Sequence, residues 1–170
     1  LAPGTRLAGR YALDRLLAER EIETVWLARD TARGNTGVAL RFLPARLWND
    51  VQARATLIQE GQRSARLSHP AILGITGVDS GDPPFLVTEL VEAATLAEEL
   101  SRRQSSGEPP LGVPETLTLL EAVAAALDHA HGSDILHLEV TPSRILLVPG
   151  APGSPARWTP VLEQFGLAAE

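Results

Sequence analysis

Short apolar-rich runs recur through the first half of the chain, and this pattern predicts β-strands. The runs are rich in aromatic and β-branched residues, and clusters of Gly, Pro, Asn and Asp separate them. Such clusters are typical of turns. The predicted strands cover residues 11–17, 24–29, 38–43, 72–78 and 85–90.

One helix is predicted between the third and the fourth of these strands. Asn49 and Asp50 are suitable N-cap residues, and the helix is expected to run to about Leu67. Apolar residues recur along it at helical spacing, so we expect one stripe to pack on the sheet. This predicted stripe consists of Val51, Ala55, Ile58 and Ala65.

The second half of the chain has mainly helical patterns. Thr95 and Glu98 form a capping box, which predicts a short helix ending near Arg103. Pro114 suits the first turn of a longer helix that runs to about His131. Strands followed by helices indicate an α+β fold. The predicted apolar face of the longer helix consists of Leu117, Leu120, Ala124, Leu127 and His131.

Composition limits the classes of function that are open to the chain. Its 170 residues suffice for one domain, and the net charge of −6 argues against non-specific binding to nucleic acid or to anionic membrane. We find no segment typical of a membrane helix or a signal peptide. The chain contains no Met, so we expect a piece of a longer protein. All 15 basic side chains are Arg, which excludes any mechanism that needs a lysine of this chain.

The segment HLEVTPSRIL at residues 137–146 resembles the catalytic loop of bacterial Ser/Thr protein kinases, H-R-D-(L/I/V)-K-P-x-N-I-L. This resemblance implies an α+β, protein-kinase-like fold. We expect a five-stranded antiparallel small lobe with one main helix, followed by part of the helical large lobe. Residues 1–10 are a lead-in, residues 11–90 the small lobe, and residues 91–170 the hinge and a large lobe that stops after the D-F-G-like motif.

The residues that carry chemistry in this family are changed here. In the family, the loop Asp accepts a proton from the substrate hydroxyl, the Lys steadies the phosphoryl group, and the Asn binds magnesium. Leu138, Glu139, Thr141 and Arg144 stand in place of Arg, Asp, Lys and Asn, and Gln164 replaces the Asp of D-F-G. Glu139 keeps a carboxylate, but both metal ligands are lost, so we expect no magnesium site.

The glycine-rich loop that covers the ATP phosphates in the family is also altered. Ala18, Arg20 and Glu23 stand at its glycine positions, so we expect weak or absent ATP binding. The acidic residues Glu19, Glu21 and Glu23 either bring negative charge towards the phosphates or point outwards from a hairpin tip. The sequence leaves both orientations open.

Arg41 takes the place of the strand lysine in the V-A-I-K motif, directly after Ala39 and Leu40. Glu60 takes the place of the helix glutamate that pairs with this lysine in the family. We favour an Arg41–Glu60 pair over two solvated charges, because strand alternation points Arg41 inwards. An Arg keeps the positive charge of the lysine but not its geometry.

The hinge is the part of the resemblance that is least damaged. Thr88 stands at the gatekeeper position, and the backbone of Glu89 to Val91 would bind adenine. Backbone groups do not depend on side-chain identity. Among the four histidines, His131 and His137 fit buried positions of the family, and His69 fits its turn after the helix. His129 and His131 are two apart on a helix and point to different faces, so we expect no metal site.

Together, these features predict a pseudokinase that acts as a protein-binding scaffold or regulatory module, without enzyme activity or a cofactor. One alternative is a nucleotide-sensing domain. Another is an atypical enzyme, in which Arg20, Arg41 and Arg144 bind phosphates without magnesium and Glu139 acts as a base. We expect a protein partner or an adjacent domain, and a cytoplasmic location, with a membrane span outside this piece left open.

Overall fold

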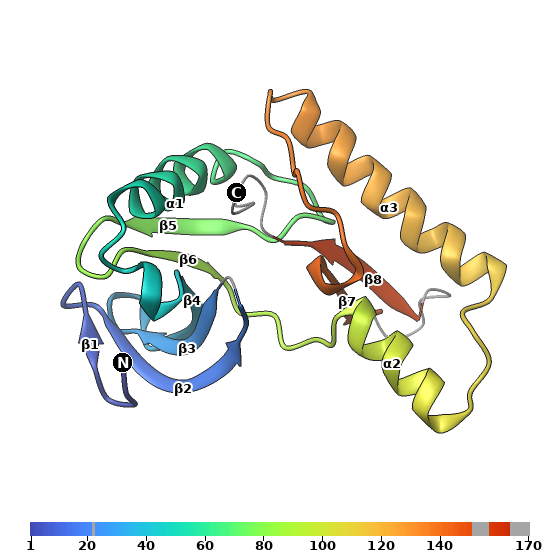
Figure 1. Ribbon diagram of the computed structural model, residues 1–170, viewed down its shortest axis with the longest axis horizontal. Helices are drawn as coiled ribbons and strands as arrows, with labels where there is room; N and C mark the ends of the chain where they lie inside the picture. Colours follow the sequence, from blue (N-terminus) through green and yellow to red (C-terminus); the bar gives the residue numbers. More distant parts are fainter. Residues whose placement is uncertain (22, 151–156, 164–170) are drawn as a thin grey trace. The chain divides into compact units, whose positions relative to one another are not determined.

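The computed structural model describes residues 1–21, 23–150 and 157–163. The chain folds as two compact units (Figure 1). Of the described residues, those in 1–66 and 74–90 form the first unit, and those in 67–73 and 91–163 form the second. The predicted α+β arrangement is confirmed.

An antiparallel sheet forms the first unit, and its strands follow the order β1-β2-β3-β4-β6-β5. All five strands predicted for this unit are present. The predicted number of five strands is nevertheless too low for the described residues. A two-residue strand adds a sixth at the edge of the sheet, next to β2. The strands are β1 (Arg6–Leu7), β2 (Tyr11–Glu19), β3 (Thr24–Asp30), β4 (Thr36–Phe42), β5 (Ile75–Asp79) and β6 (Phe85–Glu89).

Strand β4 is buried on both of its faces, and this determines where its side chains point. Val38, Leu40 and Phe42 join an apolar cluster with side chains of β2, β3 and β6. Ala39 and Arg41 alternate with them and therefore point to the opposite face of the sheet. Both are buried there, with 4% and 8% of their surface exposed.

Helix α1 (Val51–Ser64) packs against β5 and β6. The side chain of Asp50 accepts a hydrogen bond from the Ala53 amide at 2.8 Å, so the predicted N-cap is confirmed. The predicted apolar stripe is wrong, because Val51 is 81% exposed and Ala55 is also exposed. The positions that α1 buries are Leu57, Gly61 and Ser64.

Gly61 explains why the stripe differs from the prediction. A Cβ atom at this position would overlap Cδ2 of Leu86, a residue of β6 with 1% of its surface exposed. The helix therefore approaches the sheet closely at a residue without a side chain. Apolar periodicity cannot detect a contact of this kind.

The second unit contains two helices and a β-hairpin. The predicted capping box is present at the start of α2, since the Glu98 amide donates to Thr95 Oγ1 at 3.1 Å and the Thr95 amide donates to Glu98 Oε2 at 2.7 Å. None of the helices in the described ranges has the length and hydropathy of a membrane span. The elements are α2 (Leu96–Ser106), α3 (Val113–His131), the 3-10 turn η3 (Pro142–Arg144), β7 (Ile145–Pro149) and β8 (Trp158–Leu162).

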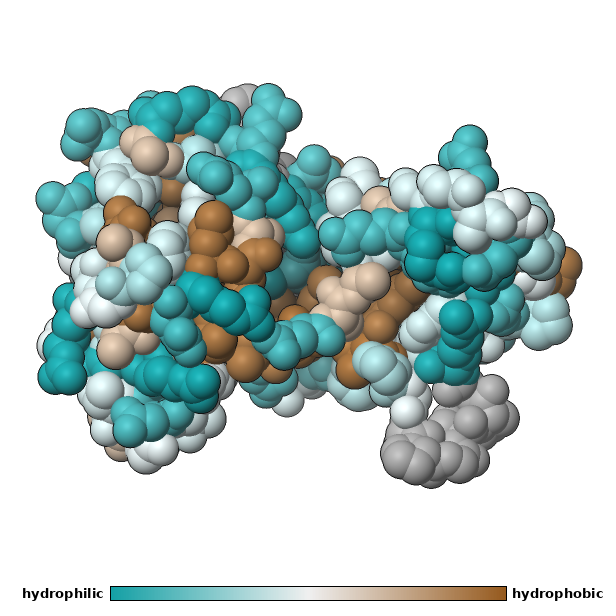
Figure 2. All heavy atoms as spheres, turned by 90° about the horizontal axis from the view of Figure 1, so that it is seen from below, coloured by the Kyte–Doolittle hydropathy of each residue, from teal (hydrophilic) through white to brown (hydrophobic). Residues whose placement is uncertain are grey.

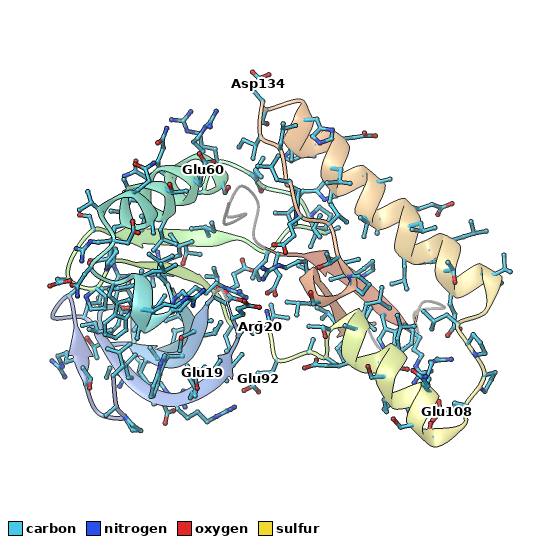
Figure 3. All side chains as sticks on the ribbon, in the orientation of Figure 1. Glu19, Arg20, Glu60, Glu92, Glu108 and Asp134 are labelled. Carbon is cyan, nitrogen blue, oxygen red and sulfur yellow. The ribbon has the colours of Figure 1, made fainter. Side chains whose placement is uncertain are left out.

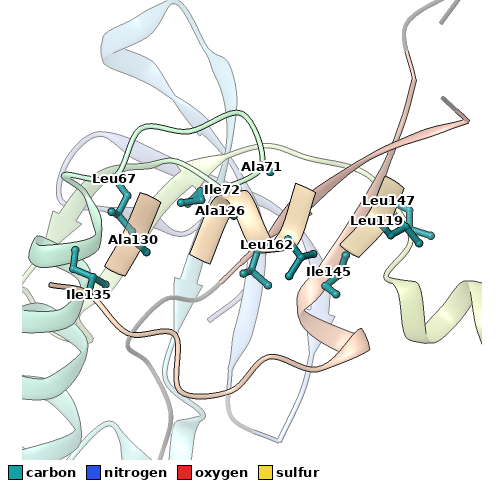
Figure 4. Close-up of a cluster of buried hydrophobic side chains, with 11 residues drawn as sticks. Leu67, Ala71, Ile72, Leu119, Ala126, Ala130, Ile135, Ile145, Leu147 and Leu162 are labelled. Carbon is teal, nitrogen blue, oxygen red and sulfur yellow. The ribbon is translucent and has the colours of Figure 1, made fainter. Parts of the chain in front are cut away.

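Helix α3 packs its apolar side chains on β8, but it uses a different face from the predicted one. Leu117 and Leu120 are 52% and 59% exposed, and His131 is also exposed. Figure 4 shows the resulting core of the second unit. Its members from α3 are Leu119, Val123, Ala126 and Ala130.

Polar and charged side chains cover much of the face shown in Figure 2, and apolar patches lie between them in both units. This mixture agrees with the ordinary composition of the chain, in which 21% of the residues are charged.

We expect Gly61→Ala to lower the free energy of unfolding by about 1–2 kcal/mol, because the added methyl group must displace a packed leucine. Denaturation with urea would measure this change. Gln62→Ala is a matched control, since it also adds an alanine to α1 but at an exposed position. A Gly61→Ala variant as stable as the original protein would contradict the close contact, because Ala is otherwise the better helix former.

Candidate functional site

His137 anchors the loop that resembles a catalytic loop. Its side chain is buried, with 2% of the residue exposed, as the sequence predicted. Nε2 lies 2.9 Å from the carbonyl oxygen of Glu163, and Nδ1 accepts a hydrogen bond from the Glu139 amide at 3.2 Å. A neutral imidazole with its proton on Nε2 satisfies both contacts. The loop is therefore held to the chain directly after β8.

Burial of the imidazole lowers the pKa of His137 below its ordinary value of 6.5. A proton on Nδ1 would also remove the acceptor that the Glu139 amide needs. Both effects favour the neutral side chain in the folded protein. The other predicted buried histidine, His131, is exposed, so that prediction is wrong.

Glu139 and Arg144 form an ion pair within this loop, which the sequence analysis did not predict. The Nη2 group of Arg144 donates to Glu139 Oε2 at 3.1 Å. The arginine side chain is 6% exposed and the glutamate side chain is 45% exposed. A buried cation therefore holds a carboxylate that still reaches solvent.

The backbone around this pair is also fixed. Leu138 has a φ of +66° and is 70% exposed, so it points away from the core. The Glu163 amide donates to the carbonyl of Arg144 at 3.0 Å. Thr141, at the position of the family's lysine, lies with its hydroxyl 2.9 Å from that of Ser143.

In the first unit, Arg41 lies on the same face of the sheet as Leu86, against which α1 packs. Its Nη1 group donates to Glu23 Oε2 at 3.0 Å and to Oε1 at 3.3 Å. Its Nε lies 3.5 Å from the hydroxyl of Thr88, a long contact. The inward direction predicted for Arg41 is therefore confirmed.

The partner predicted for Arg41 is wrong. Glu60 instead pairs with Arg63 on the same helix, at 3.3 Å, and forms no pair with Arg41 in the described structure. Figure 3 shows Glu60 on α1, well apart from Arg20 at the tip of the β2–β3 hairpin. The hairpin, and not the helix, supplies the carboxylate.

The positions of the family's glycine-rich loop form the end of this hairpin. Ala18 lies in β2, and the Arg20 amide donates to the Glu23 carbonyl at 2.8 Å. Arg20 Nη1 also pairs with Glu23 Oε1 at 2.9 Å. Of the acidic residues whose orientation the sequence left open, Glu19 and Glu21 are exposed and Glu23 is buried.

The predicted hinge begins where β6 ends. Thr88 is 2% exposed and lies opposite Ala39 in the β4–β6 register. Its hydroxyl donates to the Glu89 carbonyl at 3.2 Å. The Glu89 side chain is exposed, and Val91 packs on a small apolar cluster of the second unit.

The described residues contain no group of three or more His, Asp or Glu side chains that could hold a metal ion. The rings of His69 and His129 lie 5.3 Å apart, in a tilted arrangement. Gln164, at the D-F-G-like position, lies outside the described residues.

The sheet, the anchored loop and the inward basic residue together define a protein kinase type of architecture. Residues 13–152 match the family described as protein tyrosine and serine/threonine kinase. The crystal structure of the PknI kinase domain double mutant from Mycobacterium tuberculosis has a TM-score of 0.84 and 27% identity, over 99% of this chain and 63% of that one. This chain belongs to the protein kinase family, and the predicted fold is confirmed.

Several curated relatives are bacterial. The chain is 35% identical over 148 residues to a probable serine/threonine-protein kinase of Streptomyces coelicolor, covering 84% of this chain and 21% of the relative. It is 30% identical over 145 residues to PrkC of Bacillus subtilis, covering 85% and 22%. It is 32% identical over 152 residues to PknA of Mycobacterium tuberculosis, covering 86% and 34%. The chain thus spans between about a fifth and a third of these relatives.

These names overturn the function predicted from the sequence. The relatives are named serine/threonine-protein kinases, which are enzymes, so the prediction of a scaffold without enzyme activity is wrong. The prediction of no cofactor is also wrong, because members of this family use ATP and magnesium. The prediction rested on the motif residues that differ from the family. The match to the kinase family extends over residues 13–152.

We expect the stability of the second unit to decrease as the pH falls from about 7.5 to about 5.5. The folded pKa of His137 is lowered, so below 6.5 the unfolded chain binds a proton that the folded chain does not. His137→Gln should lower the unfolding free energy at neutral pH by about 2 kcal/mol, through loss of buried hydrogen bonds, and should flatten this pH dependence.

Thermal unfolding at a series of pH values would measure both effects. His131→Gln, at an exposed position, is the control and should keep the original slope. A His137→Gln variant with the same pH slope as the original protein would contradict the anchoring role of the neutral imidazole.

Proposed function

We propose that this chain is the ATP-binding part of a bacterial serine/threonine protein kinase, which transfers the γ-phosphoryl group of ATP to a hydroxyl group of a protein. The observation that carries the proposal is the half-exposed carboxylate of Glu139 on the anchored loop. A carboxylate at this position accepts the hydroxyl proton in the family. The names of the relatives and the match over residues 13–152 support the same function.

Glu139 can act as the base because its position is fixed from two sides. Its amide donates to His137, and its carboxylate is held by Arg144 at 3.1 Å. The carboxylate takes the proton of the acceptor hydroxyl while the hydroxyl oxygen bonds to the γ-phosphorus. The bond from this phosphorus to the bridging oxygen breaks, and ADP leaves with the electron pair.

The first unit supplies groups that suit a nucleotide. Arg41 carries a guanidinium, which binds phosphate oxygens through paired N–H donors. Thr88 is buried at the gatekeeper position, and the hinge backbone after β6 offers hydrogen-bonding groups. These residues have different chemical roles but lie on neighbouring strands of one sheet.

Arg144 does not fit magnesium, because a guanidinium offers no lone pair to a cation. A magnesium ion that accompanies ATP would therefore take its ligands from phosphate oxygens and from groups other than Arg144. No step proposed for Glu139 or Arg41 depends on such an ion.

The protein partner expected from the sequence belongs to this proposal, since the acceptor of the phosphoryl group is a protein. The exposed apolar positions Val113, Leu117 and Leu120 on α3 support contact with further protein, because large exposed apolar side chains favour association. A cytoplasmic location follows from the need for ATP.

We expect Glu139→Gln to reduce phosphoryl transfer about 100-fold or more, because the amide cannot accept the proton. Incorporation of labelled phosphate from ATP into the intact protein or a protein acceptor, with magnesium or manganese present, would measure this loss. Glu139→Asp should retain more activity than Glu139→Gln, since it keeps the carboxylate.

Glu121→Gln is the matched control, because Glu121 is an exposed carboxylate on α3 and should tolerate the same change. Full activity of Glu139→Gln would exclude Glu139 as the base. Background incorporation by the unaltered intact protein, with either metal, would contradict the proposed function itself.

A further inference from the structure

We propose that Glu23 is the positioning residue for Arg41, in place of the helix glutamate that has this role in the kinase family. The inference rests on the proposed function, because it assigns Arg41 to the phosphates of ATP. Glu23 itself acts through Arg41 and does not contact the nucleotide.

The register of the sheet brings the two side chains together. Val25 of β3 lies directly opposite Arg41 of β4. Glu23 precedes Val25 by two residues, so its side chain points to the same face of the sheet and is a diagonal neighbour of Arg41. Diagonal neighbours are within reach of long side chains, and both carboxylate oxygens of Glu23 lie within 3.3 Å of Arg41 Nη1.

Both members of this pair are buried, with 5% of Glu23 and 8% of Arg41 exposed. A buried charge needs a partner, because removal from water is costly for an unpaired ion. Thr88 lies on the same face, two residues beyond the partner of Arg41 in the β4–β6 register, and its hydroxyl lies 3.5 Å from Arg41 Nε. The carboxylate of Glu23, just before β3, and the hydroxyl of Thr88 on β6 therefore contact the guanidinium from the two sides of β4.

Arg20 adds a second positive charge to the same carboxylate, at 2.9 Å from Glu23 Oε1. The backbone bond from the Arg20 amide to the Glu23 carbonyl closes the hairpin at the same place. Glu23 is thus fixed by its backbone and its side chain, as a residue that positions another group must be.

Glu60 is unsuited to this role in the described structure. It pairs with Arg63, three residues further along the same helix. The close approach of Gly61 to Leu86 fixes the rotation of α1 about its axis, and with it the direction of Glu60.

Because Arg41 pairs with Glu23 and not with a helix glutamate, a different element controls the position of Arg41. In the family, the pair joins a strand to a mobile helix, so the position of the helix controls activity. Here the pair lies within the sheet, so Arg41 keeps its position whether or not α1 moves. We infer a kinase site whose phosphate-binding residue is set by the hairpin and not by the helix.

Steady-state kinetics of the intact protein and the affinity for ATP would test this inference. Glu23→Gln should raise KM for ATP about tenfold, while Glu60→Gln should change it by less than about twofold. Glu23→Asp should restore part of the affinity, which a purely structural defect would not predict. Glu19→Gln, an exposed acidic neighbour on the same hairpin, is the control.

A double-mutant cycle separates positioning from folding. If Glu23 acts through Arg41, then adding Glu23→Gln to Arg41→Gln should change KM for ATP by less than about twofold. If Glu23→Gln raised KM for ATP by the same factor with Arg41 present and with Arg41→Gln, the inference would be overturned. Normal kinetics of Glu23→Gln together with a raised KM of Glu60→Gln would also overturn the inference, but not the proposed function. Failure of the unaltered protein to bind ATP would overturn both.

Discussion

The burial of β4 on both faces is the constraint on which the first unit depends. Alternate residues of this strand must satisfy two different environments, an apolar cluster on one side and the face under α1 on the other. Arg41 falls on the second face, so its charge cannot reach bulk water and must be paired inside the sheet. The hairpin carboxylate of Glu23 and the gatekeeper hydroxyl of Thr88 supply the contacts that Arg41 needs there.

In the second unit, the catalytic-like loop is held in place without regular secondary structure. A single buried imidazole bonds to backbone groups on two segments, and an arginine beneath the loop binds its carboxylate. These contacts do not require the family's usual side chains at the metal positions. The loop can therefore keep its shape although its sequence has diverged.

Sequence alone identified the strands, the N-cap of α1, the capping box of α2 and the burial of His137, because each depends on local chemistry. It failed on the packed faces of α1 and α3. In α1, Gly61 makes a close contact with Leu86 that apolar periodicity cannot detect. Helix α3 carries apolar residues around much of its circumference, so periodicity does not select its packed face.

The partner of Arg41 was missed for another reason. Glu23 lies just before β3 and reaches Arg41 through the β3–β4 register, and no spacing rule in a single sequence fixes which residues of two strands lie opposite each other. The Glu139–Arg144 pair could have been predicted, since the two residues have opposite charges and lie five apart on one loop. The predicted loss of enzyme activity rested on the combined replacement of the family's residues at Arg41, Glu139, Thr141, Arg144 and Gln164.

The arginine at position 41 also affects how the protein can be detected. Guanidinium groups stay protonated and react poorly with acylating reagents, whereas a lysine amine beside bound phosphates reacts readily. Labels that transfer an acyl group from the phosphate end of an ATP analogue depend on such an amine. This chain has 15 basic side chains and none of them is lysine. A survey of ATP sites by amine labelling would therefore find no lysine of this chain to label at the proposed site.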